Sequence, residues 1–168
     1  KIPAIVDPAG PEGKPLSIME SGAILIYLAE KSGRFLSTNP RTHNKTLQWL
    51  FFQVANIGPM FGQFGHFYKY AGDKCQDPYP LERYKNETMR LLNVLEDQLE
   101  REPYLAGEEY SIADIATVPW VLCLDQFYEA QKELNLYSHK RVMDWRERCE
   151  SRPAFQKGMK VCPVEDDA

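Results

Sequence analysis

The stretch LSIMESGAILIYLAEKSG, residues 16–33, decides the fold of this chain, because a short apolar run passes directly into a helical pattern. Leu16 to Met19 is typical of a strand, and Glu20 to Lys31 has the spacing of a helix with one apolar face. The joint between them holds a carboxylate and a hydroxyl, Glu20 and Ser21. A charged pair at the start of an otherwise apolar helix predicts that this joint binds small charged groups.

The segment before this joint predicts a second strand. KIPAIVD, residues 1–7, is apolar and β-prone, and the Pro- and Gly-rich stretch DPAGPEGKP, residues 7–15, predicts an irregular turn. The two strands therefore predict an antiparallel hairpin. Because the chain opens inside the first of them, and an unpaired strand edge is unfavourable, we expect the sequence to be part of a longer protein.

The rest of the chain has helical periodicity. The linker SGRFLSTNP, residues 32–40, predicts a domain boundary, with one unit at 1–36 and another at 41–168. Helical patterns follow at 41–71 with a predicted kink at Gly58-Pro59, and at 81–99, 111–130, 139–150 and 154–161. The predicted fold class is a small α/β unit followed by an all-α domain.

Composition excludes several functional classes. The 168 residues have a formal net charge of −4 with no basic stripe, which argues against nucleic acid as a partner. No apolar run approaches the ~20 residues of a transmembrane helix, and we expect no membrane association and no signal peptide. The four cysteines have no metal-ligand spacing, so we expect no metal site, reduced thiols and a cytoplasmic location.

The first candidate site residues are Ile2 and Pro3. Proline cannot donate to a strand ladder, so Pro3 lies at an edge or a bend. If the Ile2–Pro3 bond is cis, the backbone of Ile2 faces outward and can pair with a peptide ligand as an added strand. The alternative is a proline that simply begins a strand.

Glu20 and Ser21 are the second candidate. A helix N-terminus attracts carboxylates through its free N–H groups and dipole, and the Ser21 hydroxyl adds a donor. Glu20 could hold an ammonium group, so the pair suits an α-amino acid head group. The alternative is that Ser21 is only an N-cap and Glu20 a first-turn acid.

These motifs together resemble the glutathione transferase superfamily, and the resemblance covers essentially the whole chain. A strand with Pro3, a turn, a strand and Glu-Ser-Gly opening a helix is similar to the glutathione-binding half of a thioredoxin-like domain. YLAGEEYSIADIATVPWV, residues 104–121, resembles the helical second domain of that superfamily. KIPAIVD, MESGAILIYLAEK, QWLFFQ, GPMFGQFGHFYKYA and RPAFQKG look closest to the Nu-class bacterial members, which act on disulfides with glutathione.

The resemblance implies a set of glutathione-binding residues and a cis Ile2–Pro3 bond. Ile2 would pair by its backbone with the cysteinyl part, and Glu20 and Ser21 would hold the γ-glutamyl head. The implied binding residues are Lys1, Ile2, Pro3, Glu20, Ser21, Gln53 and Arg83. Gln53 could instead make a buried polar contact, and Arg83 could be a solvated helix charge.

The resemblance also implies the activity. The chain would be a glutathione transferase with glutathione-dependent disulfide reductase activity, acting through a bound glutathione thiolate as a homodimer. Its thioredoxin-like domain would be partial, and the residue that stabilises the thiolate would lie before Lys1. The alternative is a non-catalytic module of the same fold that binds other proteins.

The aromatic run after residue 60 offers a pocket for a second substrate, a small electrophile or disulfide. Phe64, His66 and Phe67 are its candidate residues, although aromatic residues at this spacing are also typical of a core. Downstream, SIAD at 111–114 predicts a capping box, which gives Asp114 a role in folding rather than catalysis.

Overall fold

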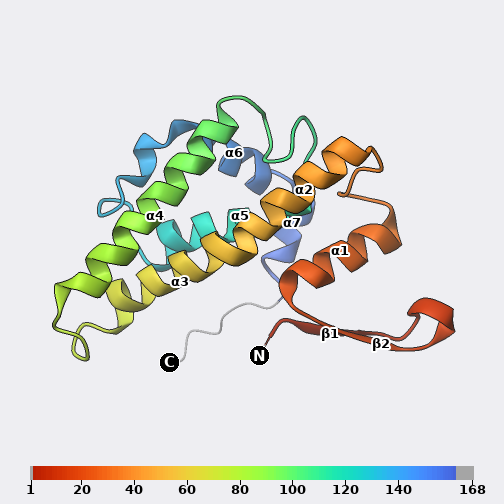
Figure 1. Ribbon diagram of the computed structural model, residues 1–168, viewed down its shortest axis with the longest axis horizontal. Helices are drawn as coiled ribbons and strands as arrows, with labels where there is room; N and C mark the ends of the chain where they lie inside the picture. The colour runs from red at the N-terminus through yellow and green to blue at the C-terminus, as the bar shows by residue number, and fades with distance from the viewer. Residues whose placement is uncertain (1, 162–168) are drawn as a thin grey trace.

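The N-terminal segment folds as the predicted hairpin and helix. The computed structural model describes residues 2–161 (Figure 1). Strands β1 (Ala4–Asp7) and β2 (Leu16–Met19) are antiparallel, with Ala4 opposite Met19, and the turn between them contains the short 3-10 helix η1 (Pro11–Gly13). Helix α1 (Ser21–Ser32) follows β2 directly and ends at Gly33, whose φ of 64° is left-handed.

The helical body begins after the linker and includes three π-helical turns. In Figure 1, α2 and α3 form one long rod, α4 lies beside it, and α5 and α6 lie behind. Its elements are α2 (Pro40–Phe52), the π turn η2 (Gln53–Ile57), α3 (Gly58–Gly65), the π turn η3 (His66–Tyr70), α4 (Pro78–Leu99), α5 (Ile112–Leu122), the π turn η4 (Cys123–Phe127), the 3-10 turn η5 (Leu136–Ser138), α6 (Lys140–Glu150) and α7 (Pro153–Gly158).

The predicted interruption at Gly58-Pro59 is a widened turn just before the dipeptide. The Gly58 N–H donates to the Gln53 carbonyl, five residues back, and Gly58 itself keeps helical dihedrals. In a regular α-helix the ring of Pro59 would clash with the carbonyl of Ala55. The π turn η2 precedes this point, so the rod from α2 to α3 continues past the proline.

Two clusters of apolar side chains hold these helices together. The larger one joins α3, α4, α5 and α6, with Phe61, Leu92 and Trp145 all fully buried. The smaller one attaches α1 to the body through Ala29, Leu50 and Ile112. The last predicted helix is shorter than expected, because α7 ends at Gly158.

The predicted capping box at the start of α5 is confirmed. Asp114 is fully buried, and its Oδ2 accepts from the backbone N–H and the hydroxyl of Ser111 at 2.9 and 3.0 Å. Its Oδ1 accepts from the Leu105 N–H at 3.0 Å and from the Trp145 indole N–H at 2.8 Å. One carboxylate therefore ties the loop before α5 to α5 and α6.

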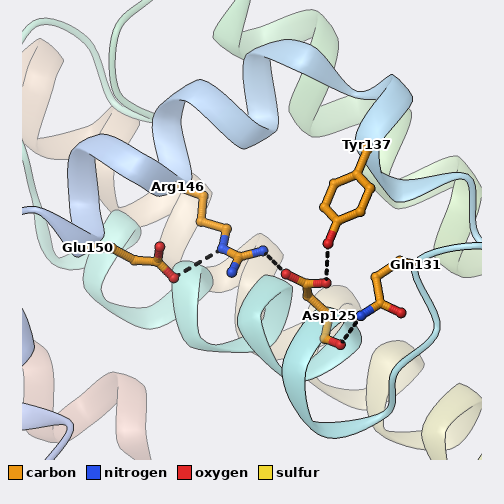
Figure 2. Close-up of polar contacts among 5 residues, drawn as sticks. All are labelled: Asp125, Gln131, Tyr137, Arg146 and Glu150. Carbon is orange, nitrogen blue, oxygen red and sulfur yellow. Dashed lines mark hydrogen bonds and ion pairs between the residues drawn. The ribbon is translucent and has the colours of Figure 1, made fainter.

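A second polar network joins η4 to α6 and to the segment between them (Figure 2). The Arg146 guanidinium donates to Asp125, and the Tyr137 hydroxyl donates to the same carboxylate at 2.9 Å. Arg146 also contacts Glu150 at 3.0 Å, and Gln131 donates to the Asp125 carbonyl oxygen at 2.8 Å. The side chains of Asp125 and Arg146 are only 8% and 11% exposed, so this ion pair is largely removed from water.

The end of α3 touches Tyr128 so closely that only glycine fits there. A Cβ atom on Gly65 would lie 2.0 Å from the Tyr128 ring, far inside any normal contact, and Tyr128 is buried. Gly65→Ala should therefore destabilise the protein by about 1–3 kcal/mol in chemical denaturation, despite the better helix propensity of alanine. Gly62→Ala is the matched control, because its Cβ would meet Trp120 at an ordinary 3.7 Å. Equal stability of the two variants would contradict this prediction.

Two further features bear on function. None of the helices among residues 2–161 is both long and apolar enough to cross a membrane. Over the same residues, no three His, Cys, Asp or Glu side chains gather in a way that could hold a metal ion.

Candidate functional site

The hairpin register brings the two sequence candidates together. Because Ala4 pairs with Met19, Pro3 lies one step beyond that pair, across from Glu20. The Ile2–Pro3 peptide bond is cis, as the resemblance implied, and the Ile2 side chain is 94% exposed. We call the group formed by Ile2, Pro3, Glu20 and Ser21 the Glu20 corner.

Glu20 has an unusual backbone conformation. Its φ of 70° and ψ of 121° are rarely adopted by a residue with a side chain. Such conformations are costly and concentrate at functional sites. Glu20 is also the N-cap residue of α1, so the alternative that Ser21 is the N-cap is wrong: Ser21 is the first residue of the helix.

The start of α1 has hydrogen-bonding capacity that the described residues leave unused. The first helical bond runs from the Ile24 N–H to the Glu20 carbonyl, and the Glu20 side chain makes no capping bond. The side chains of Glu20 and Ser21 are exposed, and neither bonds to another side chain within residues 2–161. The first N–H groups of α1 and the Ser21 hydroxyl can therefore bind an anion, and the Glu20 carboxylate can bind a cation.

Gln53 lies in the element that packs on the start of α1. A Cβ atom on Gly22 would approach the Val54 side chain to 3.2 Å, so η2 touches the first turn of α1. Gln53 is 4% exposed and makes no side-chain hydrogen bond within the described chain. A Cβ on Gly58 would come within 3.0 Å of the Gln53 amide nitrogen, so the glycine leaves room for this amide.

The other two implied binding residues are not part of the corner. Arg83 is exposed near the start of α4, and this end of α4 lies at the opposite end of the molecule from the hairpin (Figure 1). Within one chain the structure therefore does not bring Arg83 to the Glu20 corner. Lys1 lies outside the described residues.

The proposed aromatic pocket needs one correction. Phe64 is fully buried in the larger core and stacks on Tyr68 with ring centroids 5.1 Å apart, so it is a core residue and not a pocket wall. Phe67 is half-buried and stacks on Tyr84 at 5.6 Å. His66 is exposed and touches Phe67 edge-on at 5.1 Å, so these two residues stay accessible.

The sequence reasoning missed one cluster at the other end of the hairpin from the corner, formed by Asp7, Tyr27 and Lys31. The Tyr27 hydroxyl donates to Asp7 Oδ2 at 2.6 Å, and the Lys31 ammonium donates to the same oxygen. Lys31 also donates to the Ala9 carbonyl at 2.8 Å. Hydrogen bonds from Lys31 and Tyr27 lower the pKa of the Asp7 carboxyl to about 2. Tyr27 and Lys31 are four residues apart on one helix face, a signal that the sequence contained, but nothing in it identified Asp7 as their shared partner.

Known proteins with similar sequences belong to the glutathione transferase superfamily. Residues 80–153 match the family model described as glutathione S-transferase, C-terminal domain. The disulfide-bond oxidoreductase YfcG of Escherichia coli is 48% identical over 168 residues, which cover 99% of this chain and 75% of that protein.

Solved structures of similar proteins also match. A glutathione transferase from Pseudomonas putida, with one glutathione disulfide bound per subunit, is 50% identical in sequence and has a TM-score of 0.93. The match covers 97% of this chain and 70% of the Pseudomonas chain. A glutathione transferase from Burkholderia graminis, with two glutathione molecules bound per subunit, is 46% identical in sequence and has a TM-score of 0.95. The match covers 98% of this chain and 69% of the Burkholderia chain.

Proposed function

The chain belongs to the glutathione transferase superfamily, and from that premise we propose that it is a glutathione-dependent enzyme with disulfide reductase activity. The observation that supports this most directly is the Glu20 corner, where a residue with strained backbone dihedrals, the start of a helix and the exposed start of the hairpin meet. Its relatives include a disulfide-bond oxidoreductase and transferases with bound glutathione or glutathione disulfide.

In this proposal the corner binds the peptide part of glutathione. The Ser21 hydroxyl and the N–H groups at the start of α1 bind the γ-glutamyl carboxylate, since they are polarised donors without a partner among the described residues. The Glu20 carboxylate binds the γ-glutamyl ammonium. The backbone of Ile2 pairs with the cysteinyl residue, and Pro3 directs that backbone outward. Gln53 adds an amide beside the first turn of α1, and Lys1 is a further candidate contact, whereas Arg83 is not one within a single chain.

The chemistry itself belongs to the bound peptide. Glutathione supplies a thiolate, which forms a bond with one sulfur of a disulfide while the other sulfur leaves with the electron pair. The described residues orient the peptide, and we expect the group that stabilises the thiolate to come from residues before Lys1. His66 and Phe67 are proposed to contact the second substrate, a small electrophile or disulfide.

We also propose a homodimer in the cytoplasm. An accessible groove of about 710 Å³ lies between α2 and α4, and its apolar lining includes Trp49, Phe52 and Val94. Phe51 on α2 is 60% exposed, so this helix has apolar surface for a second copy. Three cysteines, Cys75, Cys123 and Cys149, are free thiols, which agrees with a reducing compartment.

Removing the binding groups of the corner should weaken glutathione binding. Calorimetry on the intact protein should detect binding of glutathione and glutathione disulfide. Ser21→Ala and Glu20→Gln should each weaken it about 10-fold or more, because hydrogen bonds to charged groups contribute about 1.5–3 kcal/mol. Both variants should also lower glutathione-dependent reduction of a small disulfide.

The matched controls lie on the same hairpin. Ser17→Ala on β2 and Glu12→Gln in η1 change exposed residues of the same types outside the corner, and both should bind glutathione like the parent. A parent protein that binds neither form of the peptide would overturn the proposed function and favour a non-catalytic module. Binding that survives both corner substitutions would place the site elsewhere.

A further inference from the structure

We propose that the side-chain amide of Gln53 and the indole N–H of Trp120 together bind the γ-glutamyl carboxylate of glutathione. We call these two groups the donor pair. This inference rests on the proposed function, because it adds Trp120, a residue outside the Glu20 corner, to the same binding site. The start of α1 binds one oxygen of the carboxylate, and the donor pair binds the other.

The glycines of α3 place the two donors at one point. A Cβ atom on Gly58 would lie 3.4 Å from Cε2 and Cζ2 of the Trp120 ring, and one on Gly62 would lie 3.7 Å from Cζ3 and Cη2. The ring therefore extends along one turn of α3, and its Gly58 end contains Cε2, the carbon bonded to the indole nitrogen. The Gln53 amide nitrogen is 3.0 Å from the same Gly58 Cβ position. Two N–H donors, one from η2 and one from α5, thus lie beside the same glycine.

Neither member of the donor pair has an acceptor among residues 2–161. The Gln53 side chain is 4% exposed, and Trp120 is half-buried. By contrast, the fully buried Trp145 donates its indole N–H to the carboxylate of the capping box at 2.8 Å. Over the described residues, the Thr88 hydroxyl is the one buried side-chain polar atom with neither a hydrogen bond nor access to solvent. The donor pair therefore still reaches the surface, where a ligand oxygen can meet it.

The donor pair lies close to the Glu20 corner because η2 packs on the first turn of α1. A Cβ atom on Gly22 would approach the Val54 side chain to 3.2 Å, and Gly22 directly follows Ser21 in the chain. Gln53 is the neighbour of Val54 in η2. A carboxylate bound at the start of α1 is therefore beside the element that carries the Gln53 amide.

The chemistry of the donor pair favours a carboxylate as its ligand. Both groups donate through N–H, and a largely buried donor without an acceptor is costly. A carboxylate has two oxygens with about four acceptor positions, more than the Ser21 hydroxyl needs. Hydrogen bonds to a carboxylate are also about twice as strong as those between neutral groups, so the remaining oxygen is the best acceptor that glutathione offers here.

The test is glutathione affinity, measured by calorimetry on the intact protein. Trp120→Phe keeps an aromatic ring and removes the N–H, and Gln53→Met keeps the length of the side chain and removes the amide. Each variant should weaken glutathione binding about 3- to 10-fold. Because both donors serve one carboxylate, the loss in the double variant should fall short of the product of the two single losses.

The identity of the bound group is tested with γ-glutamylcysteine, which keeps the γ-glutamyl carboxylate and lacks the glycyl one. Trp120→Phe should weaken binding of this dipeptide by the same factor as binding of glutathione. A loss with glutathione that disappears with γ-glutamylcysteine would overturn the assignment to the γ-glutamyl head. Gln53→Glu should weaken binding more than Gln53→Met at neutral pH, because it places a negative charge beside the ligand carboxylate.

Intrinsic fluorescence gives a readout that a structural role would not move. Glutathione should change the emission of the parent protein, and this change should be lost in Trp120→Phe. Trp49→Phe should retain it, because Trp49 lies in the groove between α2 and α4. If the donor pair instead bonds to other parts of the protein, residues before Lys1 included, the variants would lower the unfolding temperature and leave glutathione affinity unchanged. That result would overturn the inference.

The controls separate this inference from the proposed function. Gln63→Met changes an exposed glutamine of α3 and should bind glutathione like the parent. Failure of the parent protein to bind glutathione would overturn the proposed function. Parent-like affinity of Trp120→Phe and Gln53→Met, with the parent binding normally, would overturn the donor pair alone.

Discussion

Arg146→Met should lower the free energy of unfolding by about 3–5 kcal/mol, because it leaves the Asp125 carboxylate nearly buried without its cationic partner. Methionine keeps the volume and helix propensity of arginine, so the loss reflects the ion pair rather than the packing. Among residues 2–161, the Tyr137 hydroxyl would then be the one side chain still donating to that carboxylate (Figure 2). Urea denaturation at neutral pH measures the change.

The effect of Arg146→Met should depend on pH in a defined direction. Burial alone would raise the pKa of the Asp125 carboxyl, but hydrogen bonds from Arg146 and Tyr137 outweigh it, so the pKa is lowered. An acid with a lowered pKa in the folded state stabilises the fold fully above its unfolded value of about 3.9. This contribution is lost as the pH falls through the lowered value, so the difference between parent and variant should shrink below about pH 4.

An exposed ion pair provides the control. Arg90 contacts Glu87 at 2.8 Å within α4, but its side chain is 54% exposed. Arg90→Met should change stability by less than about 1 kcal/mol. If Arg90→Met and Arg146→Met destabilise the protein equally, the burial argument for the Asp125 network is wrong.

Asp114→Ala should cost about 3–5 kcal/mol, because three buried N–H donors lose their acceptor at once. These donors are the backbone N–H groups of Leu105 and Ser111 and the indole N–H of Trp145. Each buried donor left without a partner costs about 1–3 kcal/mol, and rearrangement of the loop recovers part of the sum. Thermal and chemical denaturation of the variant measure the loss.

Two further variants show whether the carboxylate acts through all of these bonds. Ser111→Ala removes only the capping hydroxyl and should cost about 1 kcal/mol. Asp97→Ala changes an exposed acid on α4 and should be close to neutral, within about 0.5 kcal/mol. A cost for Asp114→Ala no larger than that for Ser111→Ala would show that the bonds to Leu105 and Trp145 contribute little.

Much of the local structure was predictable because its causes are local. The hairpin, helix α1 with its glycine stop, the end of α4, the bounds of α6 and the capping box of α5 all follow from spacing and cap residues, whereas α4 begins at Pro78, three residues before its predicted start. The π turn before Gly58 was expected only as a kink, because the sequence contains the proline but not the way its clash is relieved. The sequence left Phe64 open between core and pocket wall, because aromatic spacing does not distinguish the two, and the structure buries it in the core.

Part of the candidate site was also predictable, because three of its residues are close together in one hairpin. Pro3, Glu20 and Ser21 are joined by one hairpin, so their proximity follows from a register that the turn and the strands determine. Arg83 is remote in one chain, because the direction of α4 depends on how the helices pack. The bonds that hold the hairpin to α1 were also missed, since Asp7 meets Lys31 across 24 residues.

The sequence by itself determined the elements, the Glu20 corner and the resemblance to the family, because each depends on neighbouring residues or on one tight turn. Only the tertiary structure decided the backbone strain at Glu20, the contacts of Asp7 with Tyr27 and Lys31, the burial of Gln53 and the Asp125–Arg146 network. These depend on which distant faces come into contact, and side-chain packing over the whole chain settles that choice. Local pattern specifies which groups are available, and packing specifies which of them meet.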